Sequence, residues 1–191
     1  MFQIYQEGYR VNHALRSKHH VEIPVQNWMS QLLKKALGEQ PKPAVLEKAI
    51  KIIVASRSSN AVAFKDAFPS LDKLSRHGKK LGVISNVSSH QVAVRILKAV
   101  RLEKFFDAVV TSAQTGIRKP DPGIFLYALM QLGLKPSEAI HVGDSEEHDV
   151  RGGKAVGLGT VLLSRKGHSR GTFADHQFQS LSETADFLKS L

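Results

Sequence analysis

The chain of 191 residues contains no cysteine. Disulfide bonds and thiolate metal sites are therefore excluded, which is typical of a protein from a reducing compartment. No run approaches the roughly 18 apolar residues that a membrane span needs, and the first residues lack the apolar core of a signal peptide. We therefore expect a cytosolic protein with no membrane partner.

The sequence is low in aromatic residues, at 7%, but its hydrophobic content of 42% and charged content of 23% are ordinary for a globular protein. This balance does not favour disorder, because enough apolar surface is available for burial. The length suits one domain with its own core, together with a small accessory lobe.

Acidic residues are too few to balance the basic ones, and the formal net charge is +10. Clustered cations would give sequence-independent affinity for nucleic-acid phosphates. The basic residues are dispersed, however, in short groups such as Arg16-Ser17-Lys18 and Lys79-Lys80, with no basic stripe interleaved with aromatic residues. We expect solvated surface charge and no nucleic-acid partner. The alternative, a nucleic-acid-binding protein, would show steeply salt-dependent binding.

Apolar spacing over residues 1–63 predicts helices and no strands. An imperfect pattern begins with Phe2, Ile4, Tyr5, Tyr9 and Val11. Clearer helical spacing follows in Trp28, Leu32, Leu33 and Leu37 before Gly38, and again from Val45 to Val54 after two prolines. We expect a helical lobe here, with the single tryptophan in its core.

Residues 64–191 alternate between strand and helix patterns. We expect strands over 80–84, 106–110, 139–142 and 160–163, and helices ending near Gly78 and over 92–100, 124–132 and 181–188. A further helix from about residue 147 should turn Val150 and Ala155 inward and stop at Gly157, and 164–172 reads as a loop. This alternation predicts an α/β fold, a Rossmann-like parallel sheet with helices on both faces.

Two carboxylates bracket the turn after the expected strand over 139–142. Gly143 ends that strand, Asp144 follows it at the edge where open α/β sheets bind ligands, and Asp149 lies at the start of the next helix. Such a pair suits Mg²⁺, which takes oxygen ligands. The alternative reading is a helix N-cap and a solvated acid.

Polar groups also follow the two preceding strands. Ser85 and Asn86 place a hydroxyl and an amide where they can donate to a phosphoryl oxygen, although such a pair also occurs in ordinary turns. In the Lys-Pro-Asp-Pro turn, Asp121 and Pro122 are explained as an N-cap and a first helical residue. Lys119 has no such structural explanation, and it can neutralise charge between a phosphoryl group and a carboxylate.

These motifs, in this order, resemble the haloacid dehalogenase-like hydrolase superfamily over about residues 64–188. The resemblance implies an α/β core over 64–191 and a helical cap lobe over 1–63. The stretch around Tyr9 and Trp28 is similar to the eukaryotic haloacid dehalogenase-like hydrolase domain-containing protein 3 group.

The resemblance also implies a role for each motif residue. Ser85 corresponds to the phosphate-binding hydroxyl, Asn86 to its neighbour, and Lys119 to the charge-neutralising lysine. Asp144 corresponds to the metal-ligand acid, supported by Asp149. The implied chemistry is attack by an aspartate on a small phosphorylated substrate with Mg²⁺, followed by hydrolysis of the aspartyl intermediate.

The chain departs from this pattern at the nucleophile. The family carries it in an Asp-x-Asp-x-Thr-like motif on a central strand that precedes the cap, but this chain has no Asp-x-Asp, and its first aspartate is Asp66. We expect an incomplete core that lacks this strand through gene boundaries, splicing or the segment cloned, with Mg²⁺ binding weak or absent. The alternative is a non-catalytic relative that binds a phosphorylated ligand or a protein partner. Coding sequence upstream of Met1 would distinguish the two.

The histidines suggest a metal or acid–base role, and the candidates are His19-His20, His141 and His148, of which His148 lies beside Asp149. No pair of histidines has the spacing of a zinc site on a helix. We therefore expect ordinary roles for them.

Overall fold

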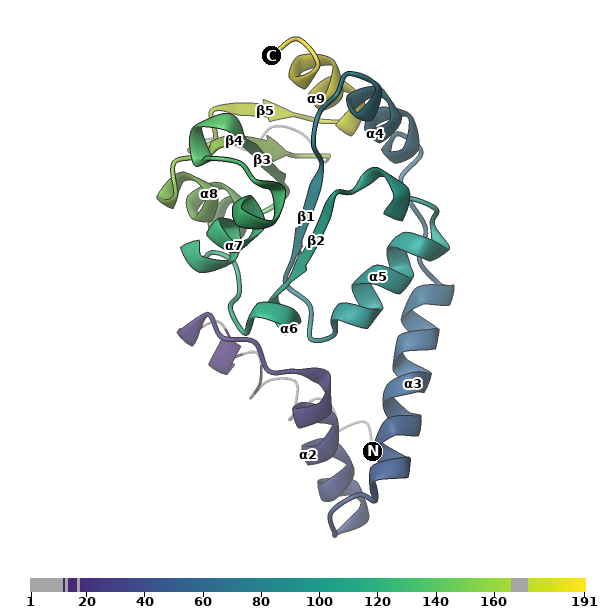
Figure 1. Ribbon diagram of the computed structural model, residues 1–191. Helices are drawn as coiled ribbons and strands as arrows, with labels where there is room; N and C mark the ends of the chain where they lie inside the picture. The colour runs from purple at the N-terminus through teal and green to yellow at the C-terminus, as the bar shows by residue number, and fades with distance from the viewer. Residues whose placement is uncertain (1–11, 13, 17, 166–171) are drawn as a thin grey trace.

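The computed structural model describes residues 12, 14–16, 18–165 and 172–191 (Figure 1). The apolar pattern that begins at Phe2 lies outside these residues, as does most of the loop expected over 164–172. Within the described part of the chain, no helix is both long and apolar enough to cross a membrane. The combination of parallel strands with many helices confirms the α/β class.

Two helices, α2 (Val25–Leu37) and α3 (Pro43–Ser59), form an arm that projects from the strands (Figure 1). α2 ends at Gly38, which takes a left-handed conformation with a φ of 79° that glycine adopts without strain. α3 packs against α5 (His90–Ala99), so this helix pair fixes the arm to the rest of the molecule. Trp28, expected in the core, is only half-buried, whereas its neighbour Met29 is buried.

The segment before α2 also contacts the α/β part. Val21 forms an isolated antiparallel bridge with Ile117, and the N–H of Glu22 donates to the carbonyl of Gly116 at 2.8 Å. The helical spacing of this region did not predict that contact. The division into a cap lobe over 1–63 and a core over 64–191 stays a prediction.

The α/β part follows the expected alternation. Its first half contains α4 (Ala67–Arg76), β1 (Gly82–Ser85), α5, a 3-10 turn (Glu103–Phe105), β2 (Ala108–Thr111) and α6 (Ser112–Thr115). Its second half contains α7 (Pro122–Leu132), a 3-10 turn (Pro136–Glu138), β3 (Ile140–Gly143), a π-helical turn (Glu146–Val150), α8 (Arg151–Ala155), β4 (Gly159–Leu163), β5 (His176–Phe178) and α9 (Leu181–Leu188). Each expected strand overlaps an observed one. β5 was missed because it is short and has no apolar run.

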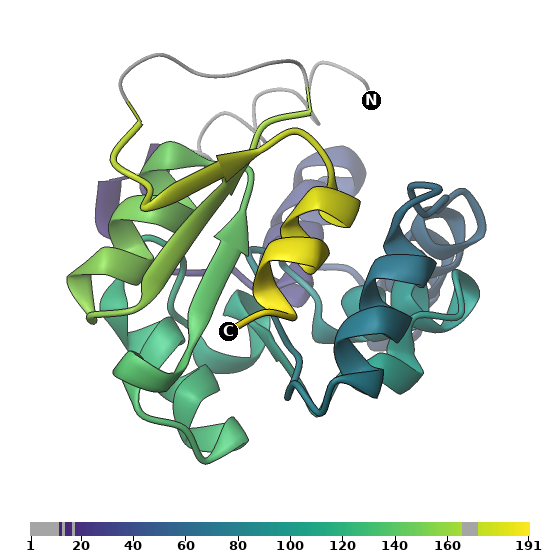
Figure 2. The same cartoon turned by 90° about the horizontal axis from the view of Figure 1, so that it is seen from above.

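The strands form two parallel sheets, whereas the sequence predicts one. β1 pairs with β2, with Gly82 opposite Ala108, while β4 lies between β3 and β5. α7 packs against β1 and β2, and α9 lies beside α4 (Figure 2). Among the described strands, none pairs with the edge of β1 that faces away from β2 or with the edge of β3 that faces away from β4, so the two sheets are separate. A cavity of about 960 Å³ is lined by both of these strands.

The buried face of α8 differs from the expected one. Val150 is buried as predicted, but Ala155 is exposed, and Gly152 and Gly153 are buried in its place. A Cβ added at Gly152 would lie 2.5 Å from the Phe125 ring of α7. The two helices approach too closely for a side chain, so glycine occupies the inward position.

We expect Gly152→Ala to lower the free energy of unfolding by about 1–3 kcal/mol, because the overlap with the Phe125 ring outweighs the helix propensity that alanine adds. Urea denaturation measures the change. Ala155→Ser, an exposed substitution in the same helix, is the matched control and should change stability by about 0.5 kcal/mol or less. Unchanged or higher stability of Gly152→Ala would contradict this account of the helix contact.

Candidate functional site

Asn86 fixes the backbone of Lys119 beside the carboxyl end of β1. Its Oδ1 accepts a hydrogen bond from the Lys119 N–H at 2.8 Å, and its Nδ2 donates to the Lys119 carbonyl at 2.9 Å. On the other side of the lysine, Asp121 caps α7 as predicted, accepting from the N–H of Gly123 at 2.8 Å, and Pro122 opens the helix. Lys119 is therefore held between the end of β1 and the start of α7.

The side chain of Lys119 bridges the two sheets. Its Nζ donates to the carbonyl of Ile84 in β1 at 2.9 Å and to Oδ1 of Asp149, after β3, at 2.6 Å. The lysine side chain is 13% exposed and the aspartate side chain 4%. Breaking a buried ion pair by removing one partner typically costs about 3–5 kcal/mol. This bridge therefore ties the carboxyl end of β1 to the turn that follows β3.

Both oxygens of Asp149 have partners within the cluster. Its Oδ1 also lies 2.9 Å from Nε2 of His141, and its Oδ2 accepts from the N–H of Ser145 at 3.0 Å. Gly143 makes room for it, since a Cβ there would lie 2.2 Å from the Asp149 carboxyl carbon. Burial by itself raises the pKa of Asp149, but the hydrogen bond from His141 and the charge and hydrogen bond of Lys119 hold that pKa well below its ordinary value. Asp149 is therefore ionised at neutral pH.

The other two predicted residues lie beside this cluster without joining it. Ser85 is the last residue of β1 and is half-buried, and Asp144 follows the last residue of β3 and is exposed. Among the described residues, no hydrogen bond links either side chain to Lys119 or Asp149. The structure thus brings together Asn86, Lys119 and Asp149, and the roles expected for all five residues stay predictions.

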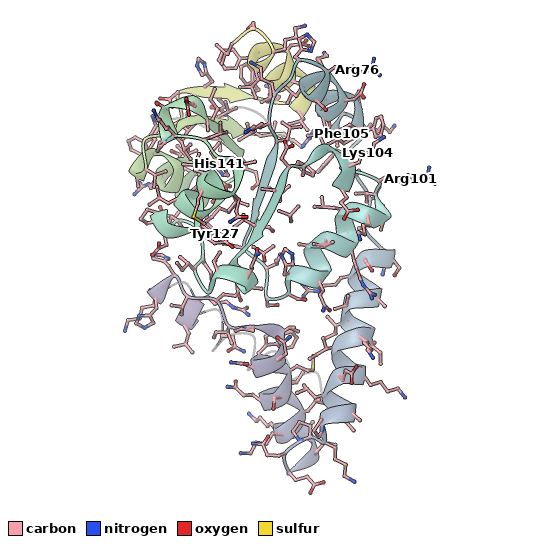
Figure 3. The ribbon with its side chains drawn as sticks, in the orientation of Figure 1. Arg76, Arg101, Lys104, Phe105, Tyr127 and His141 are labelled. Atoms are coloured by element: carbon pink, nitrogen blue, oxygen red, sulfur yellow. The ribbon has the colours of Figure 1, made fainter. Side chains whose placement is uncertain are left out.

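His141 belongs to the cluster, although the sequence predicts only an ordinary role for it. Besides its contact with Asp149, its ring packs edge-on against Phe125, with centroids 5.0 Å apart. Figure 3 shows it on the β3 side of the molecule, close to α7. Strand periodicity was the signal in the sequence that could have identified His141. Alternate residues of a strand share a face, so His141 lies on the same face as Gly143, against which Asp149 packs.

Glu22 is a second residue that the sequence analysis did not single out. Its side chain is fully buried, and it accepts hydrogen bonds from the Ser112 hydroxyl at 2.6 Å and from the Arg118 guanidinium. Arg16 adds a second cation to this acid, with its Nε 3.0 Å from the carboxylate. Because Arg118 directly precedes Lys119 in the chain, this network also holds the backbone that leads into the lysine. The sequence did contain a signal for this buried acid, because Glu22 lies within the apolar run around Val21.

The donor set of the acidic motif does not fit a Mg²⁺ site. Mg²⁺ needs octahedral oxygen ligands and commonly takes one or two carboxylates. Both oxygens of Asp149 already have partners, namely Lys119, His141 and Ser145, and Asp144 is the other carboxylate that the sequence predicts as a metal ligand. In the part of the chain that is described, no three His, Asp or Glu side chains form a metal-binding group. A metal-dependent step therefore has no support from this arrangement.

The arrangement leaves hydrogen-bond donors from which an anion could accept. Lys119 Nζ carries three donors, of which Ile84 and Asp149 take two. The neighbouring Ser85 hydroxyl and the second N–H of the Asn86 amide can donate at the same edge. In open α/β sheets, ligands bind at the carboxyl ends of the strands, where these groups lie.

Known proteins resemble this chain over most of its length. Residues 4–163 match the family model for haloacid dehalogenase-like hydrolases. The glyceraldehyde 3-phosphate phosphatase of Methanopyrus kandleri is 30% identical over 82% of this chain and 64% of its own length. The haloacid dehalogenase-like hydrolase domain-containing protein 3 of Danio rerio is 31% identical over 83% of this chain and 67% of its own length.

Solved structures agree with the fold. A haloacid dehalogenase-family phosphatase from Thermococcus onnurineus is 30% identical, with a TM-score of 0.67 over 85% of this chain and 72% of its own. A 2-haloacid dehalogenase from Pseudomonas syringae, 22% identical, has a TM-score of 0.77 over 98% of this chain and 80% of its own, and shows the fold alone.

The matched relatives are longer than this chain. It spans 64% of the Methanopyrus kandleri phosphatase and 54% of the glyceraldehyde 3-phosphate phosphatase of Methanocaldococcus jannaschii. The family match itself covers more than half of the chain and includes every residue of the Asn86–Lys119–Asp149 cluster. The chain therefore belongs to the haloacid dehalogenase-like hydrolase family.

Proposed function

We propose that this chain binds the phosphoryl group of a small phosphorylated substrate at Lys119, as part of a haloacid dehalogenase-like phosphatase. The observation that carries the proposal is the position of Nζ, which the Ile84 carbonyl and Asp149 hold at the carboxyl ends of the strands. A buried, preorganised cation stabilises phosphoryl oxygens more than a solvated one does. The phosphatase names of two matched relatives support the substrate class.

In this proposal each polar residue has a distinct task. Lys119 neutralises phosphoryl charge, and the Ser85 hydroxyl donates a hydrogen bond to a phosphoryl oxygen. Asn86 uses both ends of its amide on the Lys119 backbone, so it positions the lysine and can offer one remaining N–H to the substrate. Asp149, with His141, keeps the ammonium group in place.

We expect none of Asp149, Asp144 and Asp66 to attack phosphorus in this chain. Both oxygens of Asp149 have partners, Asp144 is exposed, and the sequence contains no Asp-x-Asp motif. Asp66, the first aspartate, accepts two hydrogen bonds from Arg165, at 2.9 and 3.0 Å, and one from the Leu181 N–H. The Arg165 hydrogen bonds lower its pKa, and the residue joins α4 to α9. The proposal is therefore binding without appreciable turnover by this chain alone.

The same observation favours a second candidate, a non-catalytic protein that keeps the fold to bind a phosphorylated ligand or partner. Both candidates require phosphate affinity at Lys119. They differ in whether a longer protein supplies an attacking aspartate, and coding sequence upstream of Met1 separates them. The activity, substrate and Mg²⁺ dependence of any longer protein remain proposals.

Lys119→Met should weaken binding of inorganic phosphate at least about tenfold, a loss of about 1.4 kcal/mol, because the buried cation is removed. Isothermal titration calorimetry measures the affinity. Lys48→Met, which removes an exposed lysine of α3, is the control for net charge. A cooperative thermal transition must first show that each variant is folded. Equal affinity in a folded Lys119→Met would remove the proposed site.

This chain should release no phosphate above background from an aryl phosphate in the presence of Mg²⁺. A chain extended at its N-terminus by a strand with the Asp-x-Asp motif should release phosphate, because it supplies the attacking carboxylate. Spectrophotometric phosphate release from both proteins makes the comparison. Metal-dependent turnover by the present chain, abolished by Asp144→Ala, would show that the nucleophile has been misplaced.

A further inference from the structure

Three segments that are far apart in the sequence meet at one buried carboxylate. Glu22 precedes α2, Ser112 opens α6, and Arg118 directly precedes Lys119. The Glu22 side chain has no exposed surface, and the Arg118 side chain is 18% exposed. A buried carboxylate is costly unless charged and hydrogen-bonding partners satisfy it, so the groups that Glu22 joins explain its position.

One link runs from Glu22 to the loop after β1. The carboxylate accepts a hydrogen bond from the Ser112 hydroxyl at 2.6 Å, and the oxygen of that hydroxyl accepts from the Val87 N–H at 2.9 Å. Val87 directly follows Ser85 and Asn86, the polar residues at the carboxyl end of β1. Glu22 therefore holds, through one intervening hydroxyl, the backbone next to these two polar groups.

A second link runs from Glu22 to the lysine. The Arg118 guanidinium donates to the same carboxylate. The Arg118 N–H donates to the carbonyl of His20 at 2.8 Å, so the segment before α2 holds both the side chain and the backbone of this arginine. Since Lys119 is the next residue, the point from which its side chain extends is held as well.

The two links form a closed ring of contacts. On one side, Asn86 joins the loop after β1 to the turn before α7 through its two hydrogen bonds with the Lys119 backbone. On the other side, Glu22 joins the same two segments, through Ser112 to the loop and through Arg118 to the turn. Contacts on both sides limit the relative movement of the two segments more than contacts on one side do.

The segment that contains Glu22 is attached by its backbone too. The N–H of Glu22 donates to the carbonyl of Gly116 at 2.8 Å, and the N–H of Val25 donates to the carbonyl of Ser88 at 2.7 Å. Figure 1 shows this segment beside α6, which agrees with these bonds. Glu22 is therefore held in place itself, as a residue that positions other groups must be.

We propose that Glu22 is a positioning residue for phosphoryl binding, because it sets the distance between the Ser85–Asn86 loop and Lys119. The inference rests on the proposed binding of phosphate at Lys119. Glu22 acts through Ser112 and Arg118, so that the donors on the two segments converge on one anion. Donors that are held in place before binding stabilise an anion more, since they need no ordering when it arrives.

The charge of Glu22 allows a test by the sign of the effect. Glu22→Gln keeps the size of the side chain and an oxygen for the Ser112 hydroxyl, but it removes a negative charge and the ion pair with Arg118. Through space alone, the loss of a negative charge near an anion site tightens phosphate binding. Loss of positioning weakens the binding instead, so the direction of the change separates the two effects.

We expect Glu22→Gln to weaken binding of inorganic phosphate at least about fivefold in isothermal titration calorimetry. Glu47→Gln is the matched control, because it removes an exposed carboxylate of α3 that pairs with Lys51, and its affinity should stay within about twofold. Unchanged or tighter binding by a folded Glu22→Gln would overturn the inference if Lys119→Met weakens binding. Equal affinity of Lys119→Met would instead contradict the proposed function on which the inference rests.

Amide hydrogen exchange of the ligand-free chain, resolved by residue in NMR spectra, measures the positioning without phosphate. The Lys119 N–H donates to Asn86 and should exchange at least about tenfold faster in Glu22→Gln. The Gly159 N–H donates to the Ala139 carbonyl in the other sheet, and its rate should change by less than about twofold. Equal acceleration at both amides would assign Glu22 to overall stability alone and overturn the inference.

Ser112→Ala keeps the test decisive if Glu22→Gln does not fold. It removes the hydroxyl between Glu22 and Val87 without a change of charge. We expect phosphate binding to weaken at least about threefold and exchange to become faster at Lys119 but not at Gly159. Unchanged exchange at Lys119 in this variant would overturn the inference.

Discussion

The Lys119–Asp149 ion pair is the constraint on which the arrangement of this molecule depends. It is buried, and it connects groups that follow strands of two different sheets. Asn86 positions the lysine by hydrogen bonding to its backbone, and His141 and Ser145 are the other partners of the Asp149 carboxylate. Charge, burial and hydrogen bonding therefore coincide at one point, and that point lies where an α/β sheet binds its ligands.

The same ion pair underlies the proposal that this chain binds a phosphoryl group without turning it over. A carboxylate with donors on both oxygens is a weaker nucleophile and a poorer metal ligand than a free one, while the lysine that it positions keeps one free donor. The stability of the folded chain depends on the ionised state of Asp149. Because the pKa of Asp149 is lower in the folded than in the unfolded chain, its contribution is complete above about pH 4 and is lost as the pH falls further.

Local features of the fold were predictable because they depend on neighbouring residues. The strand before Gly143 is an apolar run with a sharp end, and the Asp121 cap follows from an aspartate before a proline. The contact of His141 with Asp149 depends on which strand face meets which helix, and local spacing does not encode this. The sequence predicted Ala155 as the buried position, whereas Gly152 is buried. Local spacing does not encode this either, since the distance to α7 is a tertiary property. The split into two sheets likewise depends on strand pairing across the whole chain.

The most direct test of this account is the titration of the Asp149 carboxyl, followed by its ¹³C chemical shift in the folded chain. The account predicts no midpoint near the ordinary value of 3.8, because Lys119 and His141 hold the carboxylate ionised to lower pH. In a folded Lys119→Met variant the midpoint should rise, since the nearest charge is gone and burial remains. A midpoint near 3.8 in the unaltered chain would contradict the ion pair as the link between the two sheets.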